Sequence, residues 1–403
     1  MRWPSVRLGD LCRLKHGCAF KSQYFESHGP FVLLTPGNFN EEGGYRDQGD
    51  KTKFYVGDIP AGFILDEGDL LVAMTEQAPG LLGSSALIPA SNLFLHNQRL
   101  GRVVGLDEHR LNKRFLYYVF NTQGVRHQIS ASASGTKVRH TAPERIASVL
   151  MLLPPLDTQE RIADILSAYD DLIENNRRRM ALLEEAAQQL YREWFVRLRF
   201  PGHEHTRMID GVPEGWERKR VTEVAEVNRE SVPASFDGEI AYVDISSVTP
   251  GIINGTTTYD FKNAPSRARR VVRHGDIIWS CVRPNRRSHA AIWQPPPNLI
   301  ASTGFAVITP RTVPTSFLYE AVTTDAFVGY LENHARGAAY PAVVAGDFER
   351  AELLLAPATL VRTFAEQADY LLSLGRTLGL QNDGLRAARD LLLPRLMSGE
   401  IAV

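Results

Sequence analysis

Residues 157–198 read DTQERIADILSAYDDLIENNRRRMALLEEAAQQLYREWFVRL, and this stretch without glycine or proline decides the fold. Asp157 or Thr158 can cap the start of a helix, with Glu160 in its first turn. Mostly apolar residues recur every seven positions in two rows: Ile162, Tyr169, Asn176, Leu183 and Leu190; Leu166, Ile173, Met180, Ala187 and Trp194. This spacing is typical of a coiled coil, in which one polar residue such as Asn176 can fix the register of pairing.

A second, less regular heptad pattern lies near the C-terminus. One of its rows is apolar and the other is more polar: Phe364, Leu371, Leu378, Leu385 and Leu392; Leu360, Gln367, Leu374, Gln381 and Ala388. Gly375, Gly379 and Gly384 lower the helix propensity of this stretch. We expect the two helices to pair with each other, because pairing buries both seams; the alternative is that each is a core helix of its own domain.

Antiparallel pairing of these helices has a geometric consequence. It would place two globular domains at opposite ends of the helix pair, related by a pseudo-two-fold axis. A protein with that symmetry could contact two DNA segments separated by about one helical turn, ~34 Å, or more. The helix pair would then act as a ruler between the two segments.

The chain also contains an internal repeat of about half its length. Three motifs recur in the same order at offsets of 213, 207 and 202 residues: 3–11 and 216–224, 68–72 and 275–279, 134–137 and 336–339. In each copy, short β-rich runs such as 68–73, 241–248 and 275–280 precede one long helical stretch. We therefore predict five segments: a first copy at 1–155, a first spacer helix at 156–200, a linker at 201–213, a second copy at 214–356, and a second spacer helix with the C-terminal tail at 357–403.

The composition is that of a globular protein, with 44% hydrophobic and 23% charged residues. No apolar run approaches the ~20 residues that a membrane span needs, and no secretory core follows Met1. The three cysteines Cys12, Cys18 and Cys281 form neither an even disulfide set nor a paired zinc spacing. These features predict a cytoplasmic protein with no membrane partner.

The formal net charge of −1 hides a strong segregation of charge along the chain. Residues 41–76 carry nine acids and three bases, a local charge of −6. Residues 262–289 carry eight bases and one acid, or +7, and residues 96–145 carry nine bases and three acids, or +6. One basic stretch in each half of the chain favours contacts with phosphates; the alternative is that these are solvated surfaces.

Catalytic motifs are mostly absent from the sequence. We find no phosphate-binding loop, dinucleotide fingerprint, nucleophile elbow or adenine methyltransferase signature. Asp210, Glu217 and Lys219 resemble the spacing of metal-dependent nucleases, but they lie in a linker rich in Pro and Gly. His203 and His205 supply too few metal ligands, so an exposed linker is the better interpretation. The arginines at 177–179 are interpreted as a solvated helix face, with phosphate or partner contact as the alternative.

The chain resembles the specificity subunit of type I restriction–modification enzymes over essentially its whole length. The resemblance is carried by Trp3 with Leu8-Gly9-Asp10, by GDLLVA at 68–73, and by LLPPL at 152–156 with QERI at 159–162. It is also carried by GVPEGW at 211–216, ASTGF at 301–305 and PRLMSGEI at 394–401. The glycine-rich second helix departs from a regular coiled-coil pattern.

The resemblance implies an α+β fold, in which two repeated target-recognition domains with mixed β-sheets are separated by two long helices forming an antiparallel coiled coil. Each domain would recognise one half of a bipartite double-stranded DNA target, and the helices would set the spacing. The chain would be non-catalytic and hold no cofactor or metal of its own. It would recruit two modification subunits, which bind S-adenosylmethionine, and through them restriction subunits that use ATP and Mg. The competing hypotheses are a stand-alone nuclease using Asp210, Glu217 and Lys219, and a structural coiled-coil adaptor.

Side chains that recognise bases are chiefly Arg for guanine and Asn or Gln for adenine. In the second copy, the loop at 283–287 follows a predicted strand and is rich in such side chains. The corresponding loop of the first copy, 76–80, has no base, so we expect a glutamine there to act with a later basic loop. A tyrosine in the second copy, corresponding to Val138, could stack or pack against a sugar. The predicted DNA-contacting residues are Gln77, Lys137, Arg139, Arg283, Asn285, Arg286, Arg287 and Tyr340. Simple surface solvation is the alternative for each of them.

Overall fold

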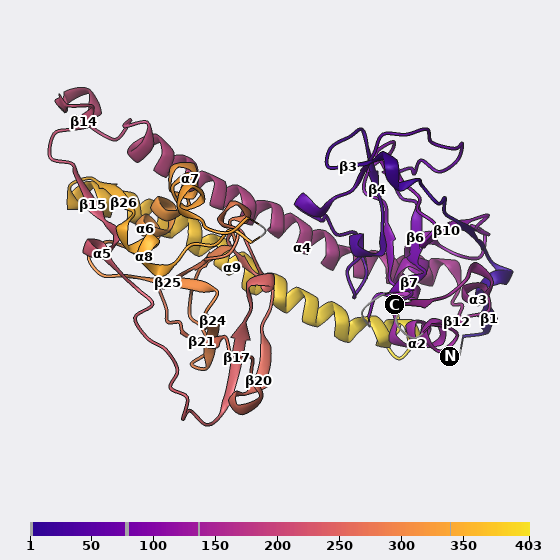
Figure 1. Ribbon diagram of the computed structural model, residues 1–403. Helices are drawn as coiled ribbons and strands as arrows, with labels where there is room; N and C mark the ends of the chain where they lie inside the picture. Colours follow the sequence, from indigo (N-terminus) through magenta and orange to yellow (C-terminus); the bar gives the residue numbers. More distant parts are fainter. Residues whose placement is uncertain (1–2, 77–79, 136–137, 339) are drawn as a thin grey trace. The chain divides into compact units, whose positions relative to one another are not determined.

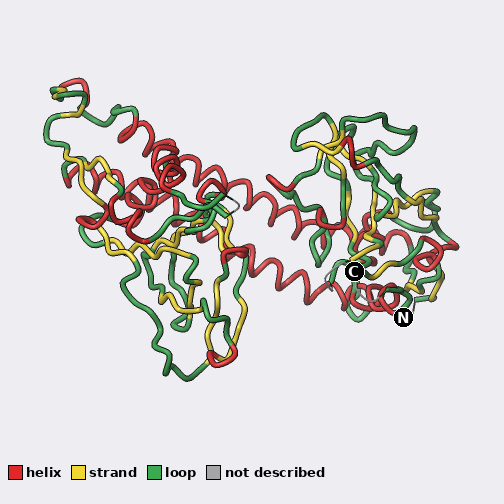
Figure 2. The backbone as a smooth tube through the Cα atoms, in the orientation of Figure 1, coloured by secondary structure: helices red, strands yellow, loops and turns green. Residues whose placement is uncertain are grey.

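The computed structural model describes residues 3–76, 80–135, 138–338 and 340–403 (Figure 1). The chain divides into two compact units, which are described separately below. The first unit consists of Met1–Asn175 and Gln381–Val403, and the second unit consists of Asn176–Leu380. Each unit therefore contains one globular copy of the repeat and a part of each long helix. Figure 2 shows the strands of each copy beside these helices.

Two four-stranded sheets form the globular part of the first unit. The order β2-β10-β6-β8 is antiparallel throughout, whereas the order β3-β5-β4-β9 contains the parallel pair β4 and β9. The strands are β1 (Ser5–Arg7), β2 (Arg13–His16), β3 (Phe25–Glu26), β4 (Phe31–Leu33), β5 (Phe54–Tyr55), β6 (Leu70–Ala73), β7 (Thr75–Glu76), β8 (Ser85–Leu87), β9 (Phe94–Leu95), β10 (Leu100–Val104), β11 (Arg139–His140) and β12 (Leu150–Leu152). The helices are α1 (Lys113–Phe120), α2 (Gln123–Ala131) and α3 (Pro143–Ala147).

The second unit repeats this plan of one antiparallel and one mixed four-stranded sheet, although the outer strand β3 lies beside β5 in the first unit and β21 lies beside β24 in the second. Its antiparallel sheet has the order β16-β25-β22-β23, and its mixed sheet has the order β20-β17-β24-β21 with β17 and β24 parallel. The strands are β13 (Met208–Ile209), β14 (Val212–Pro213), β15 (Glu217–Arg220), β16 (Ala225–Val227), β17 (Glu239–Val243), β18 (Val248–Thr249), β19 (Ile252–Ile253), β20 (Thr257–Asp260), β21 (Ala268–Val271), β22 (Ile277–Ser280), β23 (His289–Ala291), β24 (Leu299–Ser302), β25 (Phe305–Pro310) and β26 (Glu352–Leu355). The helices are α5 (Val221–Val224), α6 (Thr315–Thr323), α7 (Asp325–His334) and α8 (Ala345–Arg350).

The repeat extends to the register of individual strand pairs. Ser5 lies opposite Leu152 in the pair β1 and β12, and Arg218 lies opposite Leu354 in the pair β15 and β26. These positions differ by the predicted offsets of 213 and 202 residues. The prediction of two copies of one domain is therefore confirmed by backbone pairing as well as by motif order.

The two long helices pair antiparallel within each unit. They are α4 (Leu156–Tyr191), which continues as a π-helix over Arg192–Val196, and α9 (Ala358–Ser398). In the first unit the amide of Asn382 donates to the carbonyl of Ile173 at 3.2 Å. In the second unit the rings of Tyr191 and Phe364 lie 5.6 Å apart. Between these two contacts the α4 residue number rises from 173 to 191, while the α9 residue number falls from 382 to 364 by the same amount. Both contacts therefore belong to one antiparallel register. The predicted α+β fold with its antiparallel coiled coil is confirmed.

The seam of α4 lies where the heptad pattern predicts, with both rows buried or half-buried. The helix begins at Leu156, directly after two prolines and one residue before the predicted cap. The second row predicted for α9 is wrong by one position, since Gln367 and Gln381 are exposed. The row that faces the partner is Val361, Ala368, Gly375, Asn382, Arg389 and Leu396, all buried or half-buried. Polar and glycine residues in this seam obscured it in the sequence.

Polar contacts hold the helix pair of the first unit to its globular part. The carboxylate of Asp170 accepts a hydrogen bond from the Tyr118 hydroxyl at 2.7 Å and from the Arg389 guanidinium at 2.6 Å. Gln159 is fully buried on α4, where its side chain binds backbone groups of Asn112, Arg110 and Pro154. Hydrogen bonding of this kind is needed because buried polar groups are costly when unpaired. None of the helices in the described part of the chain is long and apolar enough to cross a membrane.

Candidate nucleic-acid interface

Each unit presents one loop with the same backbone frame. In the first unit the backbones of Ser134 and His140 exchange two hydrogen bonds of 2.9 Å. In the second unit Arg336 and Ala342, each 202 residues further on, exchange bonds of 2.8 and 2.9 Å. The glycines that follow, Gly135 and Gly337, both have φ of +103°. This conformation favours glycine, so the two frames share their backbone bonds and their glycine conformation although their other residues differ.

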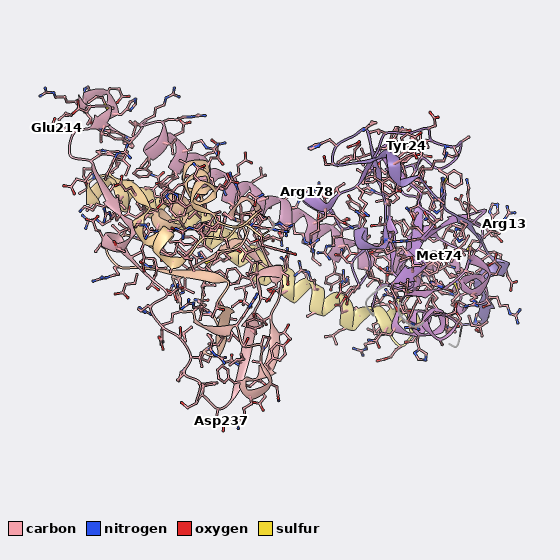
Figure 3. All side chains as sticks on the ribbon, in the orientation of Figure 1. Arg13, Tyr24, Met74, Arg178, Glu214 and Asp237 are labelled. Atoms are coloured by element: carbon pink, nitrogen blue, oxygen red, sulfur yellow. The ribbon has the colours of Figure 1, made fainter. Side chains whose placement is uncertain are left out.

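A second loop lies beside each of these frames. In the first unit β6 leads through Met74, labelled in Figure 3, into β7, which pairs with β11 at Arg139 and His140. In the second unit Val282 forms the equivalent bridge with Ala342. The predicted recognition loops after β6 and β22 are therefore brought next to the frames at 134–140 and 336–342. Among the described residues, Arg139 belongs to the loop pair of the first unit, and Arg283 and Tyr340 belong to that of the second.

A buried carboxylate organises the loop pair of the first unit. The side chain of Glu76 is buried, with 4% of the residue exposed. It accepts hydrogen bonds from the backbone N–H groups of Gly80, Leu81 and Leu82 at 3.1, 3.1 and 2.9 Å. It also accepts a hydrogen bond at 3.2 Å from Arg139, whose guanidinium donates at 2.6 Å to the carbonyl of Ser130 as well. Arg139 thus connects the two loops. The other two residues predicted here, Gln77 and Lys137, lie outside the described residues.

Arg126 supports the same loop from α2. Its guanidinium donates to the backbone carbonyls of Leu82 and Glu41, both at 2.9 Å, and to that of Gly80. Burial lowers the pKa of this arginine, while the nearby charges of Glu76 and Glu41 raise it. The sequence analysis missed both Arg126 and Glu76. Their partners become adjacent only after the strands pair, and no local motif marks them.

The loop pair of the second unit is built differently on the same frame. Arg283 and Arg287 have φ of +52° and +51°, and a single 3₁₀ turn, Pro284–Arg286, lies between them. The guanidinium carbon of Arg283 lies 4.7 Å from the centre of the Tyr340 ring, a cation–π contact between the two loops. Tyr340 is 69% exposed, and the side chains of Asn285 and Arg286 are exposed as well.

Arg287 is oriented by the start of α7. Its guanidinium donates to the carboxylate of Asp325, the first residue of that helix, and this hydrogen bond and its charge lower the pKa of Asp325. Arg286 therefore differs from its neighbour, since Arg287 is anchored to a carboxylate of the protein while Arg286 points from the tip of the turn with an exposed side chain.

The local charges of the two basic stretches overstate the charge they present. In the stretch 262–289, Lys262, Arg273 and Arg287 pair with acids from elsewhere: Asp237, Glu230 and Asp325. In the described part of the stretch 96–145, three arginines pair with acids from elsewhere: Arg102 with Asp69, Arg114 with Asp164 and Arg139 with Glu76. Part of the predicted phosphate-binding charge is therefore engaged in ion pairs.

The weaker sequence motifs form no site among the described residues. Glu217 and Lys219 pair with each other at 3.1 Å on β15, while Asp210 is an exposed turn residue after β13. His203 binds the carbonyl of Phe200 through Nδ1. In the part of the chain that the structure describes, no group of three His, Cys, Asp or Glu side chains could hold a metal ion. The arginines at 177–179 have exposed side chains on α4, and Figure 3 labels Arg178 there.

Residues 2–185 match the protein family described as the Type I restriction modification DNA specificity domain. The MjaIX type I restriction enzyme specificity subunit of Methanocaldococcus jannaschii is 22% identical over 358 residues, which cover 84% of this chain and 79% of that protein. The EcoBI specificity subunit of Escherichia coli is 30% identical over 192 residues, 47% of this chain and 36% of that protein.

A solved structure shares the fold. The type I restriction–modification S subunit from M. genitalium superposes with a TM-score of 0.56 at 16% identity, over 98% of this chain and 96% of that one. The domain match over residues 2–185, the relative aligned over most of both chains and the common fold all agree: the chain is similar to type I restriction–modification specificity subunits.

Proposed function

We propose that this chain recognises a bipartite double-stranded DNA target, with one loop pair for each half of the target. The observation that carries the proposal is that the two units share one backbone frame but carry different side chains on it. The two frames have the same backbone bonds and the same glycine conformation, yet one carries Val138 and Arg139 where the other carries Tyr340 and Pro341. Recognition of two different half-sites by two copies of one fold requires such a combination.

The chemistry of the second loop pair fits base recognition in the major groove. An exposed arginine can contact guanine through both of its terminal nitrogens, and an exposed asparagine can do the same with adenine. Arg286 and Asn285 are neighbours at one exposed turn. The tight turn and the contact of Arg283 with Tyr340 restrict the backbone that carries them, which lowers the entropy lost on binding.

In the first loop pair, different residues would position the loop and contact the DNA. Arg139 is engaged by Glu76 and Ser130 and is therefore a residue that positions the loop, while Gln77 and Lys137 would make the contacts with bases and phosphates. Phosphate contacts would fix the register of the protein on the duplex, and base contacts would supply the sequence preference.

We also propose that the long helices recruit two modification subunits, one for each unit. Leu172 in the first unit and Leu374 in the second occupy equivalent heptad positions and are 53% and 38% exposed. Exposed leucines at repeated positions fit two copies of one partner. The partners would bind S-adenosylmethionine and would connect the chain to restriction subunits that use ATP and Mg.

Sequencing of methylated bases in cells that express this chain with its modification subunit tests the function. The expected result is one split motif with two specific halves and a fixed gap. Methylation that follows one continuous motif would contradict the bipartite assignment. Purified chain should bind a duplex with that motif and leave it intact in Mg; cleavage by the chain alone would support the nuclease, and binding without sequence preference would support the adaptor.

The recruitment proposal is tested by the mass of the assembled complex. Leu172→Arg or Leu374→Arg alone should leave one modification subunit bound instead of two, and the double variant should leave none. Gln189→Ala, an exposed change elsewhere on α4, is the control and should keep both. An unchanged mass in the double variant would contradict the proposal.

A further inference from the structure

The first unit contains an open cavity of about 730 Å³. It lies among α1, α2, β12 and the C-terminal end of α9, all of which belong to this unit. Its apolar wall includes Phe115, Val119, Met151, Leu393 and Met397. A volume of this size is within the range of protein binding pockets, ~300–1,000 Å³.

The second unit shows what fills the same place in the other copy of the fold. Phe115 of the cavity corresponds to Phe317, which lies 202 residues further on in α6. The ring of Phe195 packs edge-on against Phe317 at 5.0 Å, and the ring of Tyr191 lies at 5.6 Å. Both of these aromatic residues belong to the end of α4 and its π-helical extension, and both are buried.

The helix that should fill the cavity of the first unit has smaller side chains. Leu393 and Met397 stand at the positions that correspond to Tyr191 and Phe195, 202 residues earlier. They are only partly buried, whereas the two aromatic residues are 7% and 4% exposed. The end of α9 thus occupies the place in the first unit that the end of α4 occupies in the second, but it does not fill the volume that the rings of Tyr191 and Phe195 take up there.

The rim of the cavity is charged. It carries three exposed carboxylates, Glu41, Glu42 and Asp390, and one arginine, Arg126. The guanidinium of Arg126 is occupied by three backbone carbonyls, and Asp390 accepts hydrogen bonds from Arg389 at 3.0 and 2.8 Å. Three carboxylates against Arg126 and Arg389 leave a net charge of −1 at the rim (2 − 3), which favours a basic ligand.

We propose that this cavity is a docking site for a basic polypeptide segment of a partner protein that inserts aromatic side chains. The aromatic side chains would occupy the volume that Tyr191 and Phe195 fill in the second unit, and basic neighbours would face Glu41 and Glu42. Aromatic residues in deep pockets contribute a large share of the binding energy at interfaces. The proposal goes beyond DNA recognition and does not depend on it.

The chain itself supplies the probe for this site. A synthetic peptide of residues 187–201, AQQLYREWFVRLRFP, carries the aromatic residues that fill the second unit and three arginines against one glutamate. It should bind the full-length protein in a fluorescence-anisotropy titration, with an affinity that falls as salt is raised. A peptide with Tyr191, Trp194 and Phe195 replaced by alanine should bind at least tenfold more weakly.

A pair of glycine variants locates the binding site. Gly124 lines the cavity, and a Cβ atom there would meet nothing within 4 Å, so Gly124→Phe should enter the cavity and weaken binding at least tenfold. Gly329 in α7 has equally open surroundings in the second unit, so Gly329→Phe is the matched control and should bind as the unsubstituted protein does. Circular dichroism of both variants reports whether they fold.

A charge variant tests the rim. Glu41→Lys with Glu42→Lys should weaken binding at least tenfold at low salt, whereas Glu67→Lys, an exposed change on another turn of the same unit, should not. The proposal is overturned if the peptide does not bind the unsubstituted protein, if Gly124→Phe and Gly329→Phe bind it equally, or if the alanine peptide binds as well as the aromatic one. Because no DNA is present in this assay, its outcome is independent of the proposed recognition of a bipartite target.

Discussion

Arg139 and Glu76 join the two loops of the first unit by a hydrogen bond of 3.2 Å. The carboxylate is buried and also accepts hydrogen bonds from three backbone N–H groups of the loop that follows β7, so it holds that loop in place. In the second unit the same two loops are joined instead by the stacking of Arg283 on Tyr340. One frame is thus closed by an ion pair and the other by a cation–π contact.

Removal of the arginine should loosen the first loop pair. Arg139→Ala leaves the buried carboxylate of Glu76 without its cation, and we expect a loss of about 1–3 kcal/mol in the free energy of unfolding. Recognition of the first half-site should weaken while the second is unaffected. Urea unfolding and binding to duplexes with one altered half measure these effects. Arg114→Ala removes an exposed ion pair with Asp164 and is the control, since exposed pairs contribute little.

Arg286 should act on one half-site only. Arg286→Ala removes an exposed guanidinium from the 3₁₀ turn of the second unit, and we expect a loss of about 1–3 kcal/mol in binding with relaxed preference at one base pair. Competition between duplexes that differ at single positions measures this. Arg311→Ala, an exposed arginine of the same unit that pairs with Glu226, is the control. Equal losses at both halves, or no loss, would refute the assignment.

The length of the helices should set the gap between the half-sites. Addition of one heptad to α4 after residue 175 and one to α9 after residue 380 keeps both seams in phase and adds roughly 10 Å of helix. We expect the gap in the methylated motif to grow by about three base pairs, given ~34 Å for ten. Seven residues added to the linker at 201–213 should leave the gap unchanged. A motif with an unaltered gap after the helix insertion would exclude the ruler.

Glu320 predicts a pH dependence for the second unit. This glutamate is 2% exposed on α6, and burial, with a smaller contribution from the charge of Glu184, raises its pKa to about 8. The folded state therefore disfavours the ionised form. The resulting loss of stability is absent below the ordinary glutamate pKa, grows as the pH rises, and is complete above about 8.

Replacement of Glu320 by glutamine should remove this penalty. We expect Glu320→Gln to be more stable than the unsubstituted protein at pH 9, by several kcal/mol, and nearly equal to it at pH 4.5. Urea unfolding followed by tryptophan fluorescence suits the test, because Trp194, Trp216, Trp279 and Trp293, four of the five tryptophans, belong to the second unit. Glu332→Gln, an exposed change on α7, should show no such trend.

The heptad periodicity predicted both long helices. It failed to predict which residues of α9 face α4, because some of those residues are polar or glycine. The α4 rows were correct because nine of their ten positions are apolar or aromatic. The α9 row was displaced by one residue because its true members include Gly375, Asn382 and Arg389, which do not resemble a hydrophobic row. Asn382 is buried there with its amide bound to the backbone of α4, a role that only the paired structure reveals.

The candidate interface was only partly accessible to sequence reasoning. Motif order correctly predicted which loops correspond, and the bridges at Ala342 and His140 confirm that alignment. Partners of charged residues could not be predicted, since Arg102 pairs with Asp69 and Arg287 pairs with Asp325 across long stretches of chain. A local sum of charges ignores such partners, and it therefore overestimated how basic the two stretches are.

The offset between the two copies has a structural consequence. It is 213 residues at β1 and β15 but 202 from Lys113 and Thr315 onward, through β12 and β26. The length difference between the copies thus lies between β1 and α1 in the first unit and between β15 and α6 in the second, while the part from α1 to β12 has the same length as the part from α6 to β26. An exchange of segments of different length upstream of α1 or α6 would therefore leave the spacing between these helices and the long helix that follows each of them unchanged.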